Sequence, residues 1–406
     1  MDLFNRVLII GAGIGGLALA QGLKRANIPF TVFERDDRLD SRLQGYRLKI
    51  AGEVQAKLRE LLTDEAWAKF EHVLAASAEG EMTLSATNGS IIASRRDRLR
   101  AGTPVPWTVD RGMFRDAMVT GIEESVLFCK QFVRYELDDH CVKAVFADGS
   151  VERGLLLVGA DGMRSVVRKQ FLPDYRFADT GGCCIYGKTY ITPELNEHFP
   201  GLRRRWITAV LDSSPVLQSI IFGESPMSMI LEPVQFTQYN NEQTDLPKDY
   251  VHWGLLFSRD AIPLDDATLD ETLRSRPAQL ALEMTGEWHT SVRSLCELQE
   301  QSLTSGMRVY SASPDMEVWA PSPRVTLLGD AIHTMSPAGG VGAVAALHDS
   351  ASLAEIIRKD RVSETSIGHY EAKMREFSNL CIRRSFRAGG RLVKMPPFED
   401  CSLVDI

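Results

Sequence analysis

The beginning of the chain carries a continuous apolar stretch that changes abruptly to glycine. Residues 7–16 read VLIIGAGIGG, a mainly apolar segment runs on to Asn27, and a second apolar stretch covers 31–33. A strand with apolar side chains at every position is typical of a parallel sheet that is covered on both faces. The pattern therefore predicts a strand, a glycine loop, a helix and a second strand within the first 35 residues.

Two later segments repeat the buried-strand pattern. We interpret 151–159 as one continuous strand and 324–328 as another. Two long helices are expected after the second of these strands, at about 342–359 and 363–387. The two ends of the chain are therefore predicted to build one nucleotide-binding domain, whose parts are residues 1–176 and 321–406.

The middle of the chain, 177–320, is rich in β-formers, aromatic residues and prolines. A helix is expected there only around 269–285. Earlier in the chain, 83–94 alternates around Asn88-Gly89, which is a strong hairpin signal. We expect 177–320 to form a β-rich domain, and the hairpin region 80–106 is a candidate to join its sheet.

Composition narrows the class of protein. The 406 residues carry a net charge of −8, and the basic runs at 95–96 and 203–205 are short, so we expect no nucleic-acid partner. The apolar run 7–19 is broken by glycines, so neither a signal peptide nor a membrane span is expected. Seven scattered cysteines without a metal-type CxxC pair predict reduced thiols, a cytoplasmic location and no metal site.

Gly11, Gly13 and Gly16 make a GxGxxG motif between the first strand and its helix. The first glycine permits a tight turn, the second lets a pyrophosphate approach the backbone, and the third lets the helix pack on the strand. Free N–H groups and the helix dipole would then face the phosphates. Glu34, which ends the second strand, would accept hydrogen bonds from ribose hydroxyls. The alternative is a plain turn with Glu34 on the surface.

Two later strands each end in a glycine-aspartate motif. Residues 155–168 read LLLVGADGMRSVVR, and 324–349 read RVTLLGDAIHTMSPAGGVGAVAALHD. In this order after the GxGxxG motif, they resemble the class A flavoprotein monooxygenases, the para-hydroxybenzoate hydroxylase-like family. The resemblance covers three stretches through nearly the whole chain and implies an α/β fold. Its Rossmann-like, glutathione-reductase-type FAD-binding domain would be interrupted by a β-sheet substrate domain and followed by C-terminal helices.

The resemblance also implies roles for individual residues. Asp161 would lie near the FAD pyrophosphate and the nicotinamide path, and Asp330 would hydrogen-bond the ribityl chain. Arg111 matches the family arginine on the ribityl-phosphate side, and Arg47 or Arg42 would sit close to the FAD. The alternative for Arg111 is a surface salt bridge with the preceding aspartate. The candidate cofactor-binding residues are Gly11, Gly13, Gly16, Glu34, Arg35, Arg47, Arg111, Asp161, Asp330, Pro337, Gly340, Gly342 and Ala343.

The loop 337–342 and the helix that starts near Ala343 carry the flavin chemistry in this family. The N-terminus of the helix points at the pyrimidine edge of the flavin ring, where its dipole stabilises negative charge. Many relatives have asparagine where this chain has Val344, so a potential side-chain hydrogen bond is missing. His333 often occurs in the same motif, and we interpret it as structural.

Only one GxGxxG motif stands in a strand–loop–helix setting, so no separate NAD(P)H domain is expected. The resemblance implies that NADPH or NADH binds transiently, reduces a non-covalent FAD and leaves. Reduced flavin then adds O2, and the resulting C4a-hydroperoxide inserts one oxygen atom into an electron-rich, aromatic or polycyclic small molecule. The protein must orient that substrate and shield the reaction from water.

Candidate catalytic residues lie on the strand CCIYGKTYI, which follows the GADG motif. Alternation places Tyr186 and Lys188 on one face, where a lysine beside tyrosines could lower a phenol pKa and pass a proton. The alternative is a solvent-facing polar strand. Tyr239, His252 and Trp253 are equally eligible pocket residues.

The sequence is compatible with three functions. They are NAD(P)H-dependent hydroxylation, flavin chemistry without NAD(P)H (an oxidase, dehydrogenase or cyclase), and a non-enzymatic flavin-bound sensor. A halogenase is disfavoured because the sequence has no WxWxIP-type motif. Hydroxylation, epoxidation and Baeyer–Villiger insertion share the same flavin chemistry, so all three remain alternatives.

Overall fold

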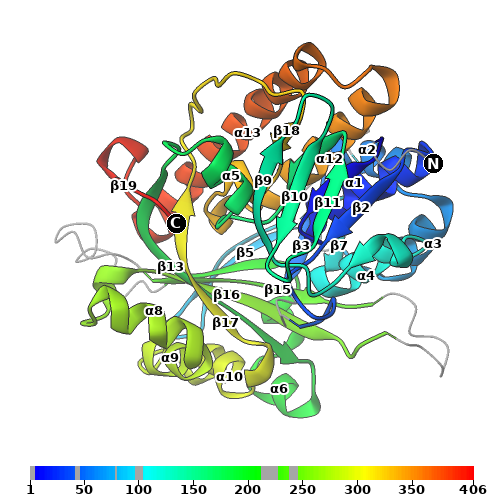
Figure 1. The fold of residues 1–406 in the computed structure, drawn as a ribbon. Helices are drawn as coiled ribbons and strands as arrows, with labels where there is room; N and C mark the ends of the chain where they lie inside the picture. The colour runs from blue at the N-terminus through cyan, green and yellow to red at the C-terminus, as the bar shows by residue number, and fades with distance from the viewer. Residues whose placement is uncertain (1–4, 42–45, 78–79, 97–103, 212–226, 237–245) are drawn as a thin grey trace.

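A five-stranded parallel sheet forms the core of the nucleotide-binding part of the molecule (Figure 1). The computed structural model describes residues 5–41, 46–77, 80–96, 104–211, 227–236 and 246–406. Parallel pairing joins every neighbouring pair of strands in this sheet. The strands, in spatial order, are β18 (Val325–Leu327), β12 (Leu156–Gly159), β1 (Val7–Ile10), β2 (Phe30–Phe33) and β8 (Val126–Leu127).

The expected single strand over 151–159 is in fact two strands in different sheets, so that prediction is wrong. β11 (Val151–Gly154) pairs antiparallel with β10 (Val142–Phe146), which in turn pairs with β9 (Phe132–Leu137). Val151 is exposed while all of β12 is buried, so only β12 has the environment of a central strand. The chain changes sheets after Gly154, where a side chain would clash with Leu8.

Helices from both ends of the chain pack together on the parallel sheet. α1 (Ile14–Arg25) contacts α12 (Gly342–Lys359), which also packs against α2 (Val54–Leu61) and α13 (Glu364–Val393). The contact is close because glycine replaces larger residues on α1: a Cβ at Gly22 would lie 2.8 Å from the Cβ of Ala354. The two predicted C-terminal helices are therefore present, and the second is longer than expected.

A larger mixed sheet lies below the parallel sheet in Figure 1. The described hairpin of β5 and β6 belongs to it, because β5 pairs with β14 in parallel. Its strands, in spatial order, are β17 (Ser305–Ser311), β13 (Phe177–Tyr190), β16 (Tyr250–Ser258), β15 (Ser228–Val234), β14 (Ile207–Leu211), β5 (Glu81–Ser85) and β6 (Ile91–Arg95), and β19 (Ser402–Val404) pairs with β13.

Helices cover the lower face of this larger sheet (Figure 1). Trp253 from β16 is fully buried among them, and Gly187 is required opposite it, because a Cβ there would lie 2.0 Å from the indole. The sequence predicted a helix only around 269–285, so it missed two of these helices. The four are α6 (Pro193–His198), α8 (Asp266–Ser275), α9 (Pro277–Met284) and α10 (Thr290–Glu297).

A small antiparallel sheet lies next to the glycine loop and leads into helix α4. Its strands are β3 (Arg47–Ile50), β7 (Trp107–Asp110) and β4 (Leu74–Ala75), and α4 (Arg111–Val119) follows β7 directly. Helix α3 (Asp64–His72) packs against α4. The register pairs Arg47 with Asp110, so this sheet brings the start of α4 beside β3.

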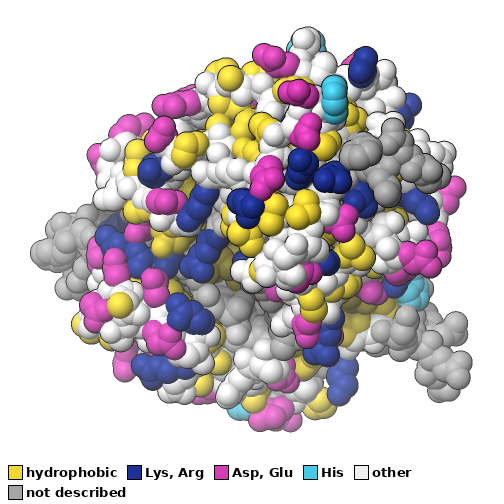
Figure 2. All heavy atoms as spheres, in the orientation of Figure 1, with side chains coloured by type: hydrophobic (Ala, Val, Ile, Leu, Met, Phe, Trp, Pro, Cys, Tyr) yellow, Lys and Arg dark blue, Asp and Glu magenta, His cyan; other side chains and the backbone are white. Residues whose placement is uncertain are grey.

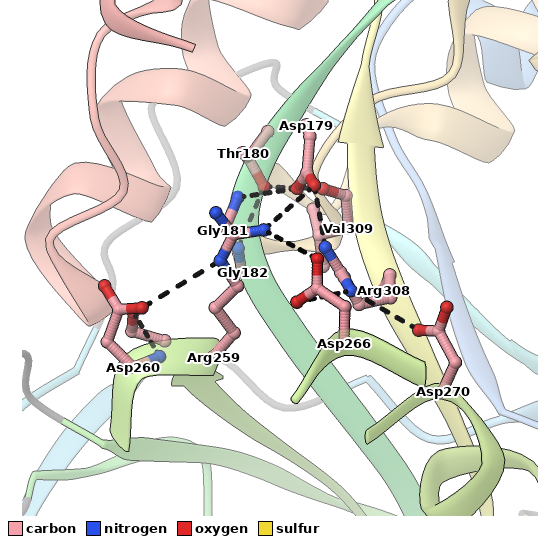
Figure 3. Close-up of polar contacts among 11 residues, drawn as sticks. Asp179, Thr180, Gly181, Gly182, Arg259, Asp260, Asp266, Asp270, Arg308 and Val309 are labelled. Carbon is pink, nitrogen blue, oxygen red and sulfur yellow. Dashed lines mark hydrogen bonds and ion pairs between the residues drawn. The ribbon is translucent and has the colours of Figure 1, made fainter. Parts of the chain in front are cut away.

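An ion-pair cluster holds β13 where it enters the larger sheet. Residues 177–179 pair with β19, the strand then bulges, and 182–190 pair with β16. Figure 3 shows Arg308 and Arg259 directed at Asp179 beside this bulge. The Arg308 guanidinium lies 2.7 Å from the Asp179 carboxylate and also contacts the carboxylates of Asp266 and Asp270 on α8.

The molecular face in Figure 2 mixes charges of both signs. Lysine and arginine side chains are interspersed there with aspartate and glutamate. None of the helices in the described ranges is at once long enough and apolar enough to span a lipid bilayer.

Candidate functional site

The glycine loop between β1 and α1 has the close backbone packing that its motif predicts. Gly11 has φ +107°, and a Cβ on it would lie 2.4 Å from the carbonyl oxygen of Ala160. A Cβ on Gly16 would lie 2.1 Å from the carbonyl oxygen of Gly11. Gly13 caps α1 without any side-chain hydrogen bond. The N-terminus of α1 therefore keeps N–H groups that no side-chain cap satisfies.

Glu34 closes this loop from the end of β2. One carboxylate oxygen accepts a hydrogen bond from the Ala12 N–H at 2.9 Å, and the other accepts from the Asp36 N–H at 3.1 Å. The side chain is buried, so the alternative that placed Glu34 on the surface is wrong. The next residue, Arg35, is exposed. Their contacts with a nucleotide remain predictions.

Arg115 supports the same loop, and the sequence reasoning missed it. Its Nε and Nη2 donate to the Ala12 carbonyl at 3.1 and 2.9 Å, and its Nη1 donates to the Leu39 carbonyl at 2.8 Å. The side chain is buried. The available signal was its position four residues after Arg111, which places both arginines on the same side of helix α4.

Arg111 and Asp330 come from distant parts of the sequence and lie within electrostatic range of each other. Asp330 begins α11 (Asp330–His333), and the residue is exposed. Desolvation raises the pKa of the Asp330 carboxyl, and the positive charges of His333 and Arg111 oppose that rise. The Arg111 guanidinium lies over the Tyr46 ring, 5.4 Å from its centre.

One of the two carboxylate oxygens of Asp161 accepts hydrogen bonds from the protein backbone. Oδ2 accepts hydrogen bonds from the N–H groups of Val166 and Val167, at the start of helix α5 (Val166–Phe171). Oδ1 is buried without a partner in the described residues. Burial raises the pKa of the Asp161 carboxyl. The expected contact of Asp161 with the cofactor stays a prediction.

The loop before α12 is short, and the buried pair of His333 and Asp349 lies next to it. It contains a single turn over Pro337–Gly339 and then Gly340, which has φ +63°. His333 Nε2 lies 2.5 Å from Asp349 Oδ2, and the same oxygen accepts the Gly329 N–H at 3.0 Å. His333 is fully buried, in agreement with its interpretation as a structural residue.

Helix α12 starts at Gly342 and, like α1, lacks a side-chain cap. Ala343 is partly exposed, while Val344 is buried in the hydrophobic core. By contrast, Thr63, Asp110 and Ser363 cap the helices α3, α4 and α13 through their side chains.

These features fit FAD. The uncapped starts of α1 and α12 offer N–H groups and positive helix ends to an anionic ligand. The open carboxylate of Asp330 suits sugar or ribityl hydroxyls, and Arg111 adds a positive charge near it.

Asp110 connects the start of α4 to the larger sheet. Its Oδ1 accepts the N–H groups of Gly112 and Met113 at 2.8 and 3.3 Å. Its Oδ2 accepts Lys188 Nζ at 2.5 Å and the Tyr250 hydroxyl at 2.7 Å. Asp110 is only 4% exposed, so the alternative of a surface salt bridge between it and Arg111 is wrong.

The candidate catalytic residues Tyr186 and Lys188 lie on one face of β13, the face on which Lys188 contacts Asp110. Lys188 is only 8% exposed, so the solvent-facing alternative is wrong. Lys188 stands in register with His252 on β16, and His252 stands in register with Glu232 on β15. Three polar residues on adjacent strands thus form a row across the sheet.

A narrow recess lies at one end of this row, and the side chains around it pack too closely to admit a water molecule. Tyr46 and Tyr186 stack there with ring centres 5.0 Å apart and planes 21° apart. Tyr186 in turn stacks on His252 at 5.7 Å and 25°. The lining residues are Tyr46, Tyr186, Gly187, Lys188, His252, Leu303 and Ser305.

Other predicted site residues are placed differently. The Arg47 guanidinium pairs with the buried Glu232 at 2.6 Å, and Lys49 pairs with the same carboxylate at 2.8 Å. The cofactor role of Arg47 stays a prediction. Trp253 belongs to the core on the opposite face, where its indole N–H donates to Thr189. Arg42 and Tyr239 lie outside the described residues.

Comparisons with known proteins agree with this arrangement. Residues 9–57 match the family described as an NAD(P)-binding Rossmann-like domain, and 306–385 match the FAD binding domain family. The fold and the site thus define a flavoprotein of the dinucleotide-binding α/β class.

Three relatives define the family more closely. The chain is 40% identical to the dual O-methyltransferase/FAD-dependent monooxygenase elcB of Phaeosphaeria nodorum, over 98% of this chain and 47% of that protein. It is 41% identical to the similarly named CTB3 of Cercospora beticola, over 98% and 47%. A solved structure from Photorhabdus luminescens, provisionally assigned as an FAD-containing monooxygenase, is 27% identical with a TM-score of 0.78, covering 96% of this chain and 98% of its own.

The chain is thus similar over 98% of its length to two FAD-dependent monooxygenases, in agreement with its resemblance to the class A, para-hydroxybenzoate hydroxylase-like family. It spans about half the length of the two curated relatives that it matches.

Proposed function

We propose that the chain catalyses NAD(P)H-dependent insertion of one oxygen atom from O2 into an electron-rich, aromatic or polycyclic small molecule. The observation that carries the proposal is the buried Asp110–Lys188 pair. It connects helix α4, which holds the glycine loop through Arg115, to the sheet face that lines the recess. A cofactor at the glycine loop and a substrate beside this sheet face would therefore be positioned by directly connected elements.

The protein's part in FAD binding follows from the site. The N–H groups at the start of α1 would face the pyrophosphate, and Glu34 would face the adenosine ribose. Arg111 and Asp330 would contact the ribityl side, and the start of α12 would lie at the flavin ring. When bound, FAD supplies electron transfer from NADPH or NADH and the activation of O2.

The sheet face would position the substrate and keep water away from it. Tyr186 is stacked between Tyr46 and His252, so a substrate would lie beside this aromatic stack. The Asp110 carboxylate pairs with the Lys188 ammonium group. This ion pair allows a charged lysine to be buried beside the recess. Restricting a substrate in this way contributes to rate by orientation and by exclusion of solvent.

The test is to mix the FAD-loaded protein with NADPH or NADH in air and with a panel of hydroxylated aromatic compounds. Substrate-dependent flavin reduction and transfer of isotopically heavy oxygen from O2 into a product are the expected results. Hydrogen peroxide as the only oxygen product, or substrate oxidation without NAD(P)H, would replace the proposal by an oxidase or dehydrogenase. Flavin that neither NAD(P)H nor any panel compound reduces would favour a sensor.

We also propose that the chain acts in the cytoplasm. All seven cysteines are free thiols in the structure, and five of them are buried. Free thiols are compatible with a reducing compartment. Fractionation of the source cells, with the protein followed by antibody, tests this proposal.

A further inference from the structure

A cavity of about 560 Å³ lies at the surface beside α2, α3 and the start of β7. Its described lining is mainly apolar and comes from α2, from α3, from Ser77 and from 104–107. That lining shares no residue with the glycine loop, the start of α12 or the recess at Tyr186. Small-molecule sites are concave, mainly apolar and roughly 300–1,000 Å³ in volume, so this cavity has the size of a ligand site.

Two tryptophans form the aromatic wall of this cavity. The rings of Trp67 and Trp107 meet edge to face, with centres 5.5 Å apart and planes 66° apart. The fully buried Phe70 packs against both of them, with ring centres 5.3 and 5.5 Å away. Because Phe70 supports both indoles from inside the protein, the wall is formed before a ligand arrives, and it suits a flat aromatic ring.

Gln55 adds a polar group to the lining. The residue is only 4% exposed, and its Nε2 donates a hydrogen bond to the Val105 carbonyl at 2.8 Å, which fixes the orientation of the amide. Its Oε1 has no hydrogen-bond partner among the described residues. An unpaired buried acceptor costs free energy, and an N–H or O–H group of a ligand would remove that cost.

Arg59 supplies the one charged side chain in the described lining. Its guanidinium lies over the Trp67 ring, 4.9 Å from the ring centre. Its Nη1 lies 3.3 Å from Oδ1 of Asp64, whose side chain is 83% exposed. Exposed ion pairs of this kind are weak, so the guanidinium can also take up an anionic group of a ligand.

We infer that this cavity binds a planar aromatic small molecule that carries an N–H or O–H donor and an anionic group. The rings would lie against Trp67 and Trp107, the donor would reach Gln55, and the anion would lie at Arg59. A flat protein surface would leave a hollow of this volume unfilled, which favours a small molecule over a second copy of the chain. The site goes beyond the proposed oxygenation, because binding there requires neither flavin reduction nor O2.

Fluorescence titration of the FAD-loaded protein tests the inference with two probes. 8-Anilinonaphthalene-1-sulfonate carries aromatic rings, an N–H group and a sulfonate, and N-phenyl-1-naphthylamine is the same molecule without the sulfonate. Ala56 is exposed in the lining, and Ala56→Phe would fill the cavity, so affinity for both probes should fall by about tenfold or more. Ala372→Phe, at an exposed alanine of α13 outside the lining, is the matched control and should change neither affinity.

Two further variants separate the parts of the site. Gln55→Met keeps the length of the side chain but lacks the amide, so both probes should bind about threefold more weakly, the effect of one neutral hydrogen bond. Arg59→Met should weaken binding of the sulfonate probe by about threefold and leave that of the uncharged probe unchanged. FAD content and the unfolding transition show that each variant is folded.

Probe binding that Ala56→Phe leaves unchanged would overturn the inference, because the probes would then bind elsewhere. So would a wild-type protein that binds neither probe. A dimer in light scattering that Ala56→Phe dissociates would assign the cavity to a contact between two copies of the chain instead. Failure of the proposed oxygenation would leave all of these binding results unchanged, so the two failures are distinguishable.

Discussion

Asp110 and Lys188 form a buried ion pair, with 2.5 Å between the carboxylate oxygen Oδ2 and Nζ. Asp110 ends the small sheet beside the glycine loop, and Lys188 lies within the larger sheet. The other oxygen of Asp110 caps helix α4. A single carboxylate therefore sets both the start of a helix on the cofactor side and the position of a lysine on the substrate side.

Replacing Lys188 tests the substrate side of this connection. We expect Lys188→Met to keep its FAD, because Lys188 makes no contact with the glycine loop in the structure. Turnover should fall by roughly tenfold, corresponding to about 1.4 kcal/mol of transition-state stabilisation. Steady-state kinetics and flavin absorbance measure the two effects. Lys359→Met, at an exposed lysine paired with Glu355, is the matched control. Loss of FAD from the Lys188 variant would contradict the assignment.

Replacing Glu34 tests the cofactor side. Glu34→Ala should weaken FAD binding by about 1.5–3 kcal/mol, the usual value of a hydrogen bond to a charged group. It should also destabilise the fold, because the buried carboxylate accepts the Ala12 N–H. Flavin retained after dialysis and the melting temperature report on the two effects. Glu60→Ala, at an exposed site on α2, should change neither. Full flavin occupancy in the Glu34 variant would exclude the role.

Asp330 should behave differently from Glu34. Asp330 is exposed in the structure, so Asp330→Ala should leave the fold as stable as the wild type. FAD affinity should nevertheless fall by about 1.5–3 kcal/mol. Equilibrium titration of the apoprotein with FAD measures the affinity, and Asp360→Ala, an exposed acid after α12, is the control. An unchanged affinity would remove Asp330 from the cofactor site.

The cluster at the β13 bulge should contribute to stability. Arg308→Met leaves Asp179 with Arg259 alone, and we expect a loss of about 3 kcal/mol in the free energy of unfolding, as for a broken buried pair. Arg274→Met removes an exposed pair with Glu271 and should cost at most about 0.5 kcal/mol. Urea unfolding compares the two variants. Equal losses would show that burial of the cluster has no energetic effect.

The His333–Asp349 pair predicts a pH dependence of stability. Burial alone would lower the pKa of His333, but the charge and hydrogen bond of Asp349 together raise it above the usual value. A raised pKa in the folded state stabilises the protein fully below the unfolded pKa, about 6.5. This stabilisation is lost as pH rises through the higher, folded pKa.

Denaturant unfolding at several pH values checks this prediction. The wild type should lose stability with rising pH above about 6.5, and His333→Asn should lose less over the same range. His369→Asn, at an exposed histidine, should follow the wild type. Parallel curves for the wild type and the His333 variant would show that the pair does not titrate in this range.

The sequence was most informative where the local backbone structure depends on residues that are adjacent in the chain. GxGxxG requires its glycines for backbone packing within a few residues, so strand, loop and helix could be predicted around Gly11 and Gly16. The Asn88-Gly89 turn likewise predicted the hairpin of β5 and β6, and Gly89 has φ +66° there. Such features depend on local dihedral angles and hydrophobic periodicity, which a sequence shows directly.

Partners that are distant in sequence could not be predicted in this way. Alternation placed Tyr186 and Lys188 on one face of β13, but it could not show that this face is buried or that Lys188 meets Asp110. The role of Arg115 could not be predicted, because only the fold brings it to the Ala12 carbonyl.

The sequence by itself thus determined the class of the fold, the glycine loop and the faces of its strands. Only the tertiary structure decided the row of Lys188, His252 and Glu232, because strand order and register select which residues become neighbours. The same holds for the break at Gly154, where the chain passes from the sheet of β11 to the sheet of β12. Local patterns report which side chains can be buried, whereas burial and charge pairing depend on contacts between segments that meet only when the chain folds.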